Sequence, residues 1–325
     1  MKKNRSEFDL ISDFFSPLAK NTGSLKLLDD VALINVDKTK DLVVSTDMLI
    51  SGVHFFSSDL PGEVAAKSIR VNISDIITKG AIPKYYFLSI ALPSNIDDNW
   101  INLFSKALKI EQKKFDVSLM GGDTVSTKGP LTINIVCMGE VKKNKLVKRS
   151  TAQIGDNIYV TGYVGEAKIG LEIIKGKFFE DIKNRDYFIK RYKYPTPRFY
   201  LANELANFAS SSIDISDGLL SDLRHICFAS NVKGNINVNL LPLSKQIKNI
   251  DLPEKFFFEM ILNGGDDYEI LFTSNPRHEV KINNLSEQLD FPITKIGYIE
   301  KGKGIEVFDY NNQKIEIKIA GYVHR

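Results

Sequence analysis

Carboxylate-bearing motifs recur beside the apolar runs of this sequence. The acids considered together are Asp29 and Asp30 in LLDDVAL, Asp47 in STDML, Asp75 in NISDI, Asp123 in GGDT, Asp214 and Asp217 in DISDG, and Asp266, Asp267 and Glu269 in GGDDYE. We expect them at strand ends or turns, which would bring several carboxylates to one edge of a sheet. Such a cluster costs several kcal/mol in repulsion and desolvation unless a cation neutralises it.

Oxygen ligands favour a particular class of cation. Carboxylates and the neighbouring hydroxyls of Ser45, Thr46, Ser74 and Ser216 suit Mg²⁺, Mn²⁺ or Ca²⁺ better than zinc. The commonest reason to gather such ions is to hold a polyphosphate. A single acid of this kind is more often a helix cap or a turn residue, so the hypothesis of a metal–phosphate site depends on the whole set.

The sequence lacks the common nucleotide-binding loops. It contains neither the G-x-x-x-x-G-K-[ST] motif nor a kinase-type glycine loop with its lysine. The stretch GYVGEAKIG is rich in glycine but has different spacing, which is typical of a turn between a strand and a helix. Phosphates would therefore be held through metal ions more than through such a loop.

Composition limits the classes of protein that fit. The chain has 325 residues, 43% of them hydrophobic and 26% charged, with a formal net charge of +3. That length fits about two domains, and a net charge so near zero argues against a partner such as nucleic acid or a membrane surface. The most basic stretch, KKNKLVKR at 142–149, is typical of a solvated hairpin tip.

Cysteine usage and the first residues favour a cytoplasmic protein. Cys137 and Cys227 lie in separate apolar stretches, which fits neither a disulfide framework nor a zinc site. Acidic residues interrupt the first fifteen positions, so we expect no signal peptide. No run approaches the length of about 18 apolar residues that a membrane span needs.

Hydrophobic periodicity predicts the elements that would position the acids. Helices are expected at 8–18, 61–80, 97–114 and near 198–209, and strands at 31–36, 41–49, 85–93, 117–125, 131–141 and 235–241. Residues 155–174 read as a strand, a turn and a helix, and the segments 293–308 and 314–325 as β-hairpins. The alternation is irregular, which predicts an α+β fold with two α/β-type domains, 1–145 and 146–325, joined near 141–155.

Seven motifs together resemble the thiamine-monophosphate kinases, a family within the aminoimidazole-ribonucleotide-synthetase-like ATP-binding superfamily. They occur in the family's order and cover nearly the whole chain. They are STDMLISGVHF, KSIRVNISDIITKGAIPKYYFLSIALP, GGDT, KRSTAQIGDNIYVTG, PTPR, IDISDGLLSDLRHI and GGDDYEILF.

The resemblance implies an enzyme that phosphorylates thiamine monophosphate to thiamine diphosphate with ATP and several Mg²⁺ ions. It implies a homodimer in which the N-terminal mixed sheets pair into a barrel. The N-terminal domain would bind ATP and Mg²⁺ and form the dimer, and a C-terminal α/β sandwich would complete the phosphate and substrate site.

The resemblance also implies roles for single residues. The implied metal ligands are Asp30, Ser45, Thr46, Asp47, Asp75, Asp123, Asp214 and Asp217. The implied ATP contacts are Gly122, Asp123, Arg149 and Ser216, and the implied substrate contacts are His54, Asp266 and Tyr322. Asp75, Asp217 and Arg149 would carry catalysis. From the residues alone, His54 also fits a buried histidine after a strand, and Tyr322 a surface residue.

Two departures from the family pattern concern the site. The family has glycines before its first acid pair, where this chain has KLLDD, so the turn before Asp30 must differ. The family commonly has Glu where Asp266 stands, one methylene shorter, so the substrate contact would weaken or pass through water.

Two alternatives remain. One is another enzyme of the superfamily; however, a selenophosphate synthetase would need an N-terminal reactive cysteine, and a hydrogenase maturation protein a C-terminal one. The other is a non-catalytic regulator that binds Mg-nucleotide.

Overall fold

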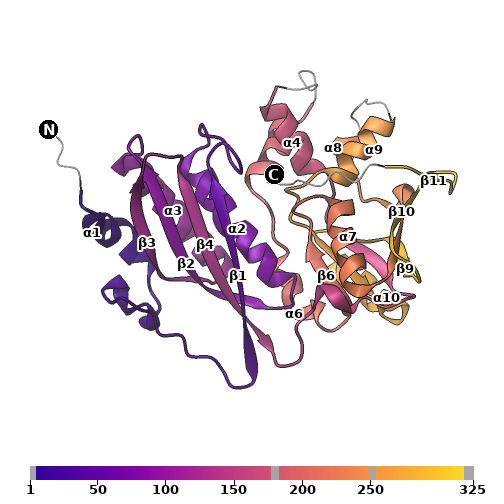
Figure 1. Ribbon diagram of the computed structural model, residues 1–325, viewed down its shortest axis with the longest axis horizontal. Helices are drawn as coiled ribbons and strands as arrows, with labels where there is room; N and C mark the ends of the chain where they lie inside the picture. Colours follow the sequence, from indigo (N-terminus) through magenta and orange to yellow (C-terminus); the bar gives the residue numbers. More distant parts are fainter. Residues whose placement is uncertain (1–4, 177–182, 249, 251–253, 318–325) are drawn as a thin grey trace. The chain divides into compact units, whose positions relative to one another are not determined.

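The computed structural model describes residues 5–176, 183–248, 250 and 254–317. The chain divides into two compact units, Met1–Ile76 with Ala81–Asn144, and Ile77–Gly80 with Lys145–Arg325. One contains a four-stranded sheet and the other a seven-stranded sheet (Figure 1). The prediction of a mixed α/β chain with two sheets is confirmed. No helix in the described ranges is long and apolar enough to cross a membrane.

The first unit is a sheet with helices on one face. Its strands are β1 (Lys40–Ile50), β2 (Ile82–Pro93), β3 (Ser118–Thr127) and β4 (Thr132–Lys142), in the order β1-β4-β2-β3. Only β2 and β3 run parallel. Helices α2 (Pro61–Ile77) and α3 (Asp98–Phe115) cover the same face (Figure 1). The side chain of Asp97 caps α3 by accepting a hydrogen bond from the Trp100 N–H.

Burial alternates along these strands because the helices cover one face. In β4, Ile133, Ile135 and Cys137 are buried, while the residues between them are partly exposed. The other face leaves apolar side chains in water: Val44 is 53% exposed and Met48 53% on β1, and Val125 is 47% exposed on β3. This uncovered face is called the open face below.

The N-terminal segment differs from its prediction in one place. The first helix forms as a continuous series of turns, α1 (Glu7–Leu10), η1 (Ile11–Phe15) and η2 (Ser16–Leu18). The strand predicted at 31–36 is wrong: these residues have no regular structure, and Val31 and Leu33 are exposed. An apolar run becomes a strand only where another strand satisfies its backbone, and the described residues place none beside it.

The second unit is built on a seven-stranded sheet in the order β11-β10-β7-β9-β5-β8-β6. The strands are β5 (Asn157–Thr161), β6 (Ala209–Asp214), β7 (Lys233–Asn237), β8 (Ile270–Ser274), β9 (Ile293–Glu300), β10 (Gly304–Phe308) and β11 (Lys314–Ile315). The helices are α4 (Glu166–Ile174), α5 (Arg185–Lys193), α6 (Ala202–Leu205), α7 (Leu219–Ser230), α8 (Lys245–Lys248), α9 (Glu254–Asn263) and α10 (Glu279–Gln288).

Both faces of this sheet contain buried side chains. Ile158 and Val160 of β5 belong to a core that includes residues of α4, α7 and α9. Tyr159 points to the opposite face and stacks on Phe272 of β8, with ring centroids 5.2 Å apart. Ile282 of α10 is also buried.

The hairpin predicted at 293–308 is wrong, because β7 lies between β9 and β10. The connection crosses the end of β7 at Lys233, whose Nζ pairs with Glu300 (2.6 Å) and Glu306 (3.1 Å). Gly302 (φ +147°) makes the crossing possible, since a Cβ there would lie 3.1 Å from the Lys233 Cβ. A hairpin does form between β10 and β11, although residues 318–325 lie outside the described ranges.

Two smaller predictions need correction. The helix expected near 198–209 is reduced to η5 (Phe199–Leu201) and α6, because β6 begins at Ala209. The basic stretch 142–149 is the connection between the two units, and it ends at the short helix η4 (Arg149–Thr151).

Candidate functional site

Helix α2 brings Asp75 to the edge strand β1. Ser45 of β1 donates a short hydrogen bond to the Asp75 carboxylate, and the backbone N–H of Asp47 donates to Asn72 Oδ1 at 3.0 Å. Since β1 is an edge strand, half of its N–H groups face away from β4 and are available to such partners. Asp75 lies in the last turn of α2, and Asp47 lies within β1. The expectation that these two acids occupy strand ends or turns is therefore wrong.

Two further predicted ligands of this unit, Thr46 and Asp123, lie on the open face. Thr46 Oγ1 is 3.1 Å from Asn134 Oδ1, and the register aligns Asn134 with Ser89 and Ser89 with Asp123. Strands β1 and β3 are three spacings apart, about 14 Å. Asp123 is thus not brought to Asp75 within this unit. Its neighbour Gly122 lets β3 approach β2, because a Cβ there would lie 1.8 Å from the Leu88 carbonyl oxygen.

Asp30 and His54 occupy different environments. Asp30 is exposed in the irregular segment after η3 (Thr22–Leu27). His54 is half-buried in the turn after β1, where its Nδ1 accepts the Ile50 N–H at 3.0 Å. This bond places the proton of the neutral imidazole on Nε2.

In the second unit, the DISDG (214–218) and GGDDYE (264–269) motifs lie side by side and are called the paired loops below. Three backbone hydrogen bonds of 2.9 Å join them. The N–H of Asp266 donates to the Ser216 carbonyl, and the N–H of Tyr268 donates to the Ile215 carbonyl. The N–H of Ile215 in turn donates to the Glu269 carbonyl. Gly265 permits this approach, since a Cβ there would lie 2.3 Å from the Ser216 oxygen. Asp266 itself has a left-handed backbone (φ +66°).

Asp267 connects this turn to the start of α4. Its carboxylate oxygens accept the N–H groups of Gly165 (2.6 Å) and Ala167 (3.1 Å) at the start of α4. Burial raises the pKa of Asp267 to about 8, although both of these hydrogen bonds lower it. Asp267 therefore ties the turn to a helix N-terminus.

Glu269 is fully buried and holds the turn through two arginines. It accepts hydrogen bonds from Arg198 Nε (2.6 Å), Arg191 Nη2 (3.0 Å) and Thr161 Oγ1 (2.7 Å). Arg198 is the arginine of the PTPR motif, and its guanidinium lies over the Phe291 ring, 4.2 Å from the centroid. Asp267 and Glu269 therefore both stabilise this turn.

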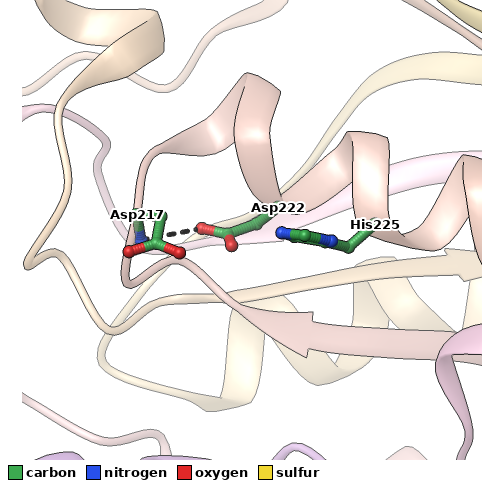
Figure 2. Close-up of side chains that lie close together, drawn as sticks. All are labelled: Asp217, Asp222 and His225. Atoms are coloured by element: carbon green, nitrogen blue, oxygen red, sulfur yellow. Dashed lines mark hydrogen bonds between the residues drawn. The ribbon is translucent and has the colours of Figure 1, made fainter. Parts of the chain in front are cut away.

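An acidic cluster lies where β6 passes into α7. Asp217, Asp222 and His225 each offer a ligand atom, and these atoms lie within 4.8 Å of one another (Figure 2). Burial raises the pKa of Asp222 well above its usual range, and the charges of Asp214 and Asp217 raise it further. A divalent cation relieves repulsion of this kind, and the carboxylate oxygens fit Mg²⁺.

Sequence reasoning missed Asp222 and His225. The available signal was their spacing in SDLRHI: three residues apart on a helix, they share the face that follows the DISDG turn. Asp222 lies in the first turn of α7, where a carboxylate can reach the N–H groups that precede the helix.

Among the described residues, Arg149 is a predicted site residue that is not brought to these loops. Arg149 is exposed in η4, and its carbonyl accepts the hydroxyl of Ser230 at 2.9 Å. Ser230 ends α7, whose 12 residues span about 18 Å, whereas Asp217 lies before the first residue of the helix. The phosphate contact of Arg149 stays a prediction. Tyr322 lies outside the described residues.

Comparison with known proteins shows which family the chain resembles. The family model for the AIR synthase related protein, N-terminal domain, matches residues 28–141. The thiamine-monophosphate kinase of Buchnera aphidicola subsp. Schizaphis graminum is 38% identical over 324 residues, which cover 98% of each chain. That of Escherichia coli K12 is 35% identical over 321 residues and covers 98% of each.

Solved structures agree. The thiamine-monophosphate kinase from Stenotrophomonas maltophilia K279a has a TM-score of 0.80 and 34% identity, covering 86% of this chain and 89% of its own. AaThiL complexed with AMPPCP and TMP has a TM-score of 0.76 and 30% identity, covering all of both chains. The hydrogenase maturation protein HypE of E. coli shares the fold alone, at 16% identity. This chain belongs to the thiamine-monophosphate kinase family.

Proposed function

We propose that this protein transfers the terminal phosphoryl group of ATP to thiamine monophosphate and so makes thiamine diphosphate. The observation that carries the proposal is that two motifs characteristic of the resemblance, DISDG and GGDDYE, are hydrogen-bonded side by side. They lie in a chain that matches thiamine-monophosphate kinases along 98% of its length. The solved relative in complex with AMPPCP and TMP supports the same pair of substrates.

The acceptor in this reaction needs little activation. A phosphate monoester has a second pKa of about 6, so near pH 7 it is largely dianionic and already nucleophilic. No general base is required, which suits a site rich in carboxylates. The chemical problem is the approach of two anions in line, which positioning and charge neutralisation solve.

The proposed Mg²⁺ ions would supply that neutralisation when bound. We assign Asp30, Ser45, Thr46, Asp47, Asp75, Asp123, Asp214 and Asp217 as their ligands. Gly122, Asp123, Arg149 and Ser216 are assigned to ATP, and Arg149 would also offset charge on the transferred group. Asp75 and Asp217 are the ligands on which we expect turnover to depend most.

Asp266, His54 and Tyr322 are assigned to thiamine monophosphate. Its partial exposure supports the role of Asp266, because the neighbouring acids Asp267 and Glu269 are buried. His54 carries its proton on Nε2, where it would donate to the substrate phosphate.

A homodimer fits the open face of the four-stranded sheet. Val44 and Met48 are about half exposed on the edge strand β1, which suits pairing with a second copy to form a barrel. The separation of Asp123 from Asp75 within one unit also supports a site that a second copy completes. In this proposal the first unit binds ATP and Mg²⁺ and dimerises, and the second, an α/β sandwich, completes the substrate site. The two buried free cysteines suit the cytoplasm.

The test is to incubate the purified chain with γ-labelled ATP, Mg²⁺ and thiamine monophosphate. We expect labelled thiamine diphosphate and an equal amount of ADP. Tight ATP binding without diphosphate would instead favour a nucleotide-binding regulator. Transfer to a different acceptor, but not to thiamine monophosphate, would favour another activity of the superfamily.

A further inference from the structure

The turn between β6 and α7 has the geometry of an anion-binding nest. Three consecutive backbone N–H groups, those of Ser216, Asp217 and Gly218, converge at the start of a 12-residue helix. Convergent N–H groups at a helix N-terminus commonly bind phosphate, and the helix dipole adds to the attraction. Gly218 has a backbone (φ +123°) that favours glycine.

In this chain a side chain of the same helix, Asp222, occupies the nest. All three N–H groups donate to one oxygen of Asp222, Oδ2, at 3.1, 3.1 and 3.2 Å. Asp222 is 1% exposed, so water does not compete for these bonds. Figure 2 shows the bond between Asp217 and Asp222. The donors that a phosphate would use are therefore already engaged by a carboxylate of the same helix.

The turn consequently presents acids in place of N–H donors. Ser216 and Asp217, which carry a hydroxyl and a carboxylate on this turn, are only half-buried. The N–H of Asp217 is itself one of the three bonds to Asp222, so the backbone that carries the Asp217 carboxylate is fixed.

We propose that Asp222 is a positioning residue whose Oδ2 occupies the nest as an internal acceptor and holds Asp217 in place as a metal ligand. The inference rests on the proposed function. It specifies that nucleotide phosphate reaches this turn through a metal ion, while the backbone N–H groups serve the protein itself. Supporting groups behind metal ligands typically change metal affinity or activity by about 10-fold to 100-fold when removed.

The experiment compares Mg²⁺-dependent ATP binding by calorimetry in the full chain and in four variants. Asp222→Ala removes the acceptor, and Asp222→Ser leaves a shorter one. Asp222→Asn keeps an oxygen that can accept all three bonds. Asp156→Ala is the matched control, because Asp156 is equally buried and accepts the Gln153 N–H at 2.9 Å, in a turn before β5.

We expect Asp222→Ala to raise the Mg²⁺ concentration for half-maximal ATP binding by about tenfold or more. Asp222→Asn should stay within about threefold of the wild type, and Asp156→Ala should lower the unfolding midpoint without moving the Mg²⁺ requirement. An unchanged Mg²⁺ requirement in Asp222→Ala overturns the inference, as does an equal rise in Asp156→Ala. If Asp222→Ala does not fold, Asp222→Ser decides by the same criterion.

This experiment separates the inference from the proposed function. Diphosphate formation by the wild type tests the function, whereas the Mg²⁺ requirement for ATP binding tests the role of Asp222. A wild type that binds Mg-ATP but makes no diphosphate contradicts the function and leaves the comparison of variants intact.

Discussion

Five acids of the two loops and of α7 differ in burial and partner: Asp217, Asp222, Asp266, Asp267 and Glu269. Asp222, Asp267 and Glu269 are buried and accept hydrogen bonds from backbone N–H groups or arginines. Asp217 and Asp266 are only partly buried and lie at the surface of the paired loops. Asp222, Asp267 and Glu269 thus serve the fold by holding the two loops and the start of α7 in place.

Asp267 gives a prediction about pH. Its pKa is about 8 in the folded chain against 3.8 ordinarily, so between pH 4 and 8 the folded state holds a proton that the unfolded state has released. Stability from this group therefore falls as pH rises through that window, by at most about 1.4 kcal/mol per pH unit. Asp267→Asn does not titrate. We expect the free energy of unfolding of the wild type, minus that of Asp267→Asn, to decrease from pH 5 to pH 8.

Urea unfolding of both proteins at several pH values checks this, because effects of all other groups cancel in the difference. A difference that is constant with pH, or that grows, would contradict a proton held on Asp267.

Asp266 gives a prediction about the acceptor substrate. Removing a charge-assisted hydrogen bond costs about 1.5–3 kcal/mol, so Asp266→Ala should raise KM for thiamine monophosphate by about tenfold or more. KM for ATP should change little. Steady-state kinetics with each substrate varied in turn decide it, with Asp290→Ala, an exposed acid outside the paired loops, as the control. An equal rise in both KM values would argue against a role confined to the acceptor.

At the scale of elements, periodicity and caps predicted most helices and strands. Asp97 identified the start of α3, and the helix predicted over 61–80 already contained Asp75. The separate expectation that Asp75 occupies a turn came from the short polar motif NISD alone, and the longer helical pattern is the correct one. Periodicity extends over many residues and averages out a local polar signal.

Strand partners were beyond the reach of sequence reasoning. Nothing local in 293–308 shows that β7 lies between β9 and β10, because strand pairing depends on segments distant in the chain. The same holds for the arginines of Glu269, which lie 71 and 78 residues away. The sequence motifs identified the acids, but only the fold shows which of them are buried among hydrogen-bond donors.

The ion pairs of Glu269 with Arg191 and Arg198 give a prediction about stability. Breaking a buried ion pair by removing one partner costs about 3–5 kcal/mol, since the other charge stays buried. Arg198→Ala should therefore lower the free energy of unfolding by about that amount, and a double-mutant cycle with Glu269→Ala should show strong coupling. The control is Lys281→Ala, which breaks an exposed pair with Glu204 (3.2 Å) worth about 0–1 kcal/mol.

Equilibrium urea unfolding measures all of these variants. If Arg198→Ala lowered the free energy of unfolding no more than Lys281→Ala does, the ion pair between Arg198 and Glu269 would be an incidental contact. The position of Asp266 would then need another explanation.

For the whole molecule, the open face of the first unit predicts how copies associate. Val44 lies on the edge strand β1, and a lysine there would place a charge inside the proposed sheet pairing. Val44→Lys should convert a dimer into a monomer in sedimentation experiments. Val280→Lys, at an exposed valine of α10 in the second unit, is the matched control and should leave the dimer intact. A wild type that sediments as a monomer, or a dimeric Val44→Lys variant, contradicts the proposed interface.

The central claim is that carboxylates of this chain hold the Mg²⁺ ions through which two phosphates are brought together. The most direct measurement is the rate of thiamine diphosphate formation by Asp75→Asn and Asp217→Asn, each confirmed as folded by circular dichroism. Asparagine preserves the shape and removes the charge, so both variants should lose about 100-fold or more in turnover, with an unfolding midpoint near that of the wild type. Turnover near the wild-type rate in both variants would contradict the account.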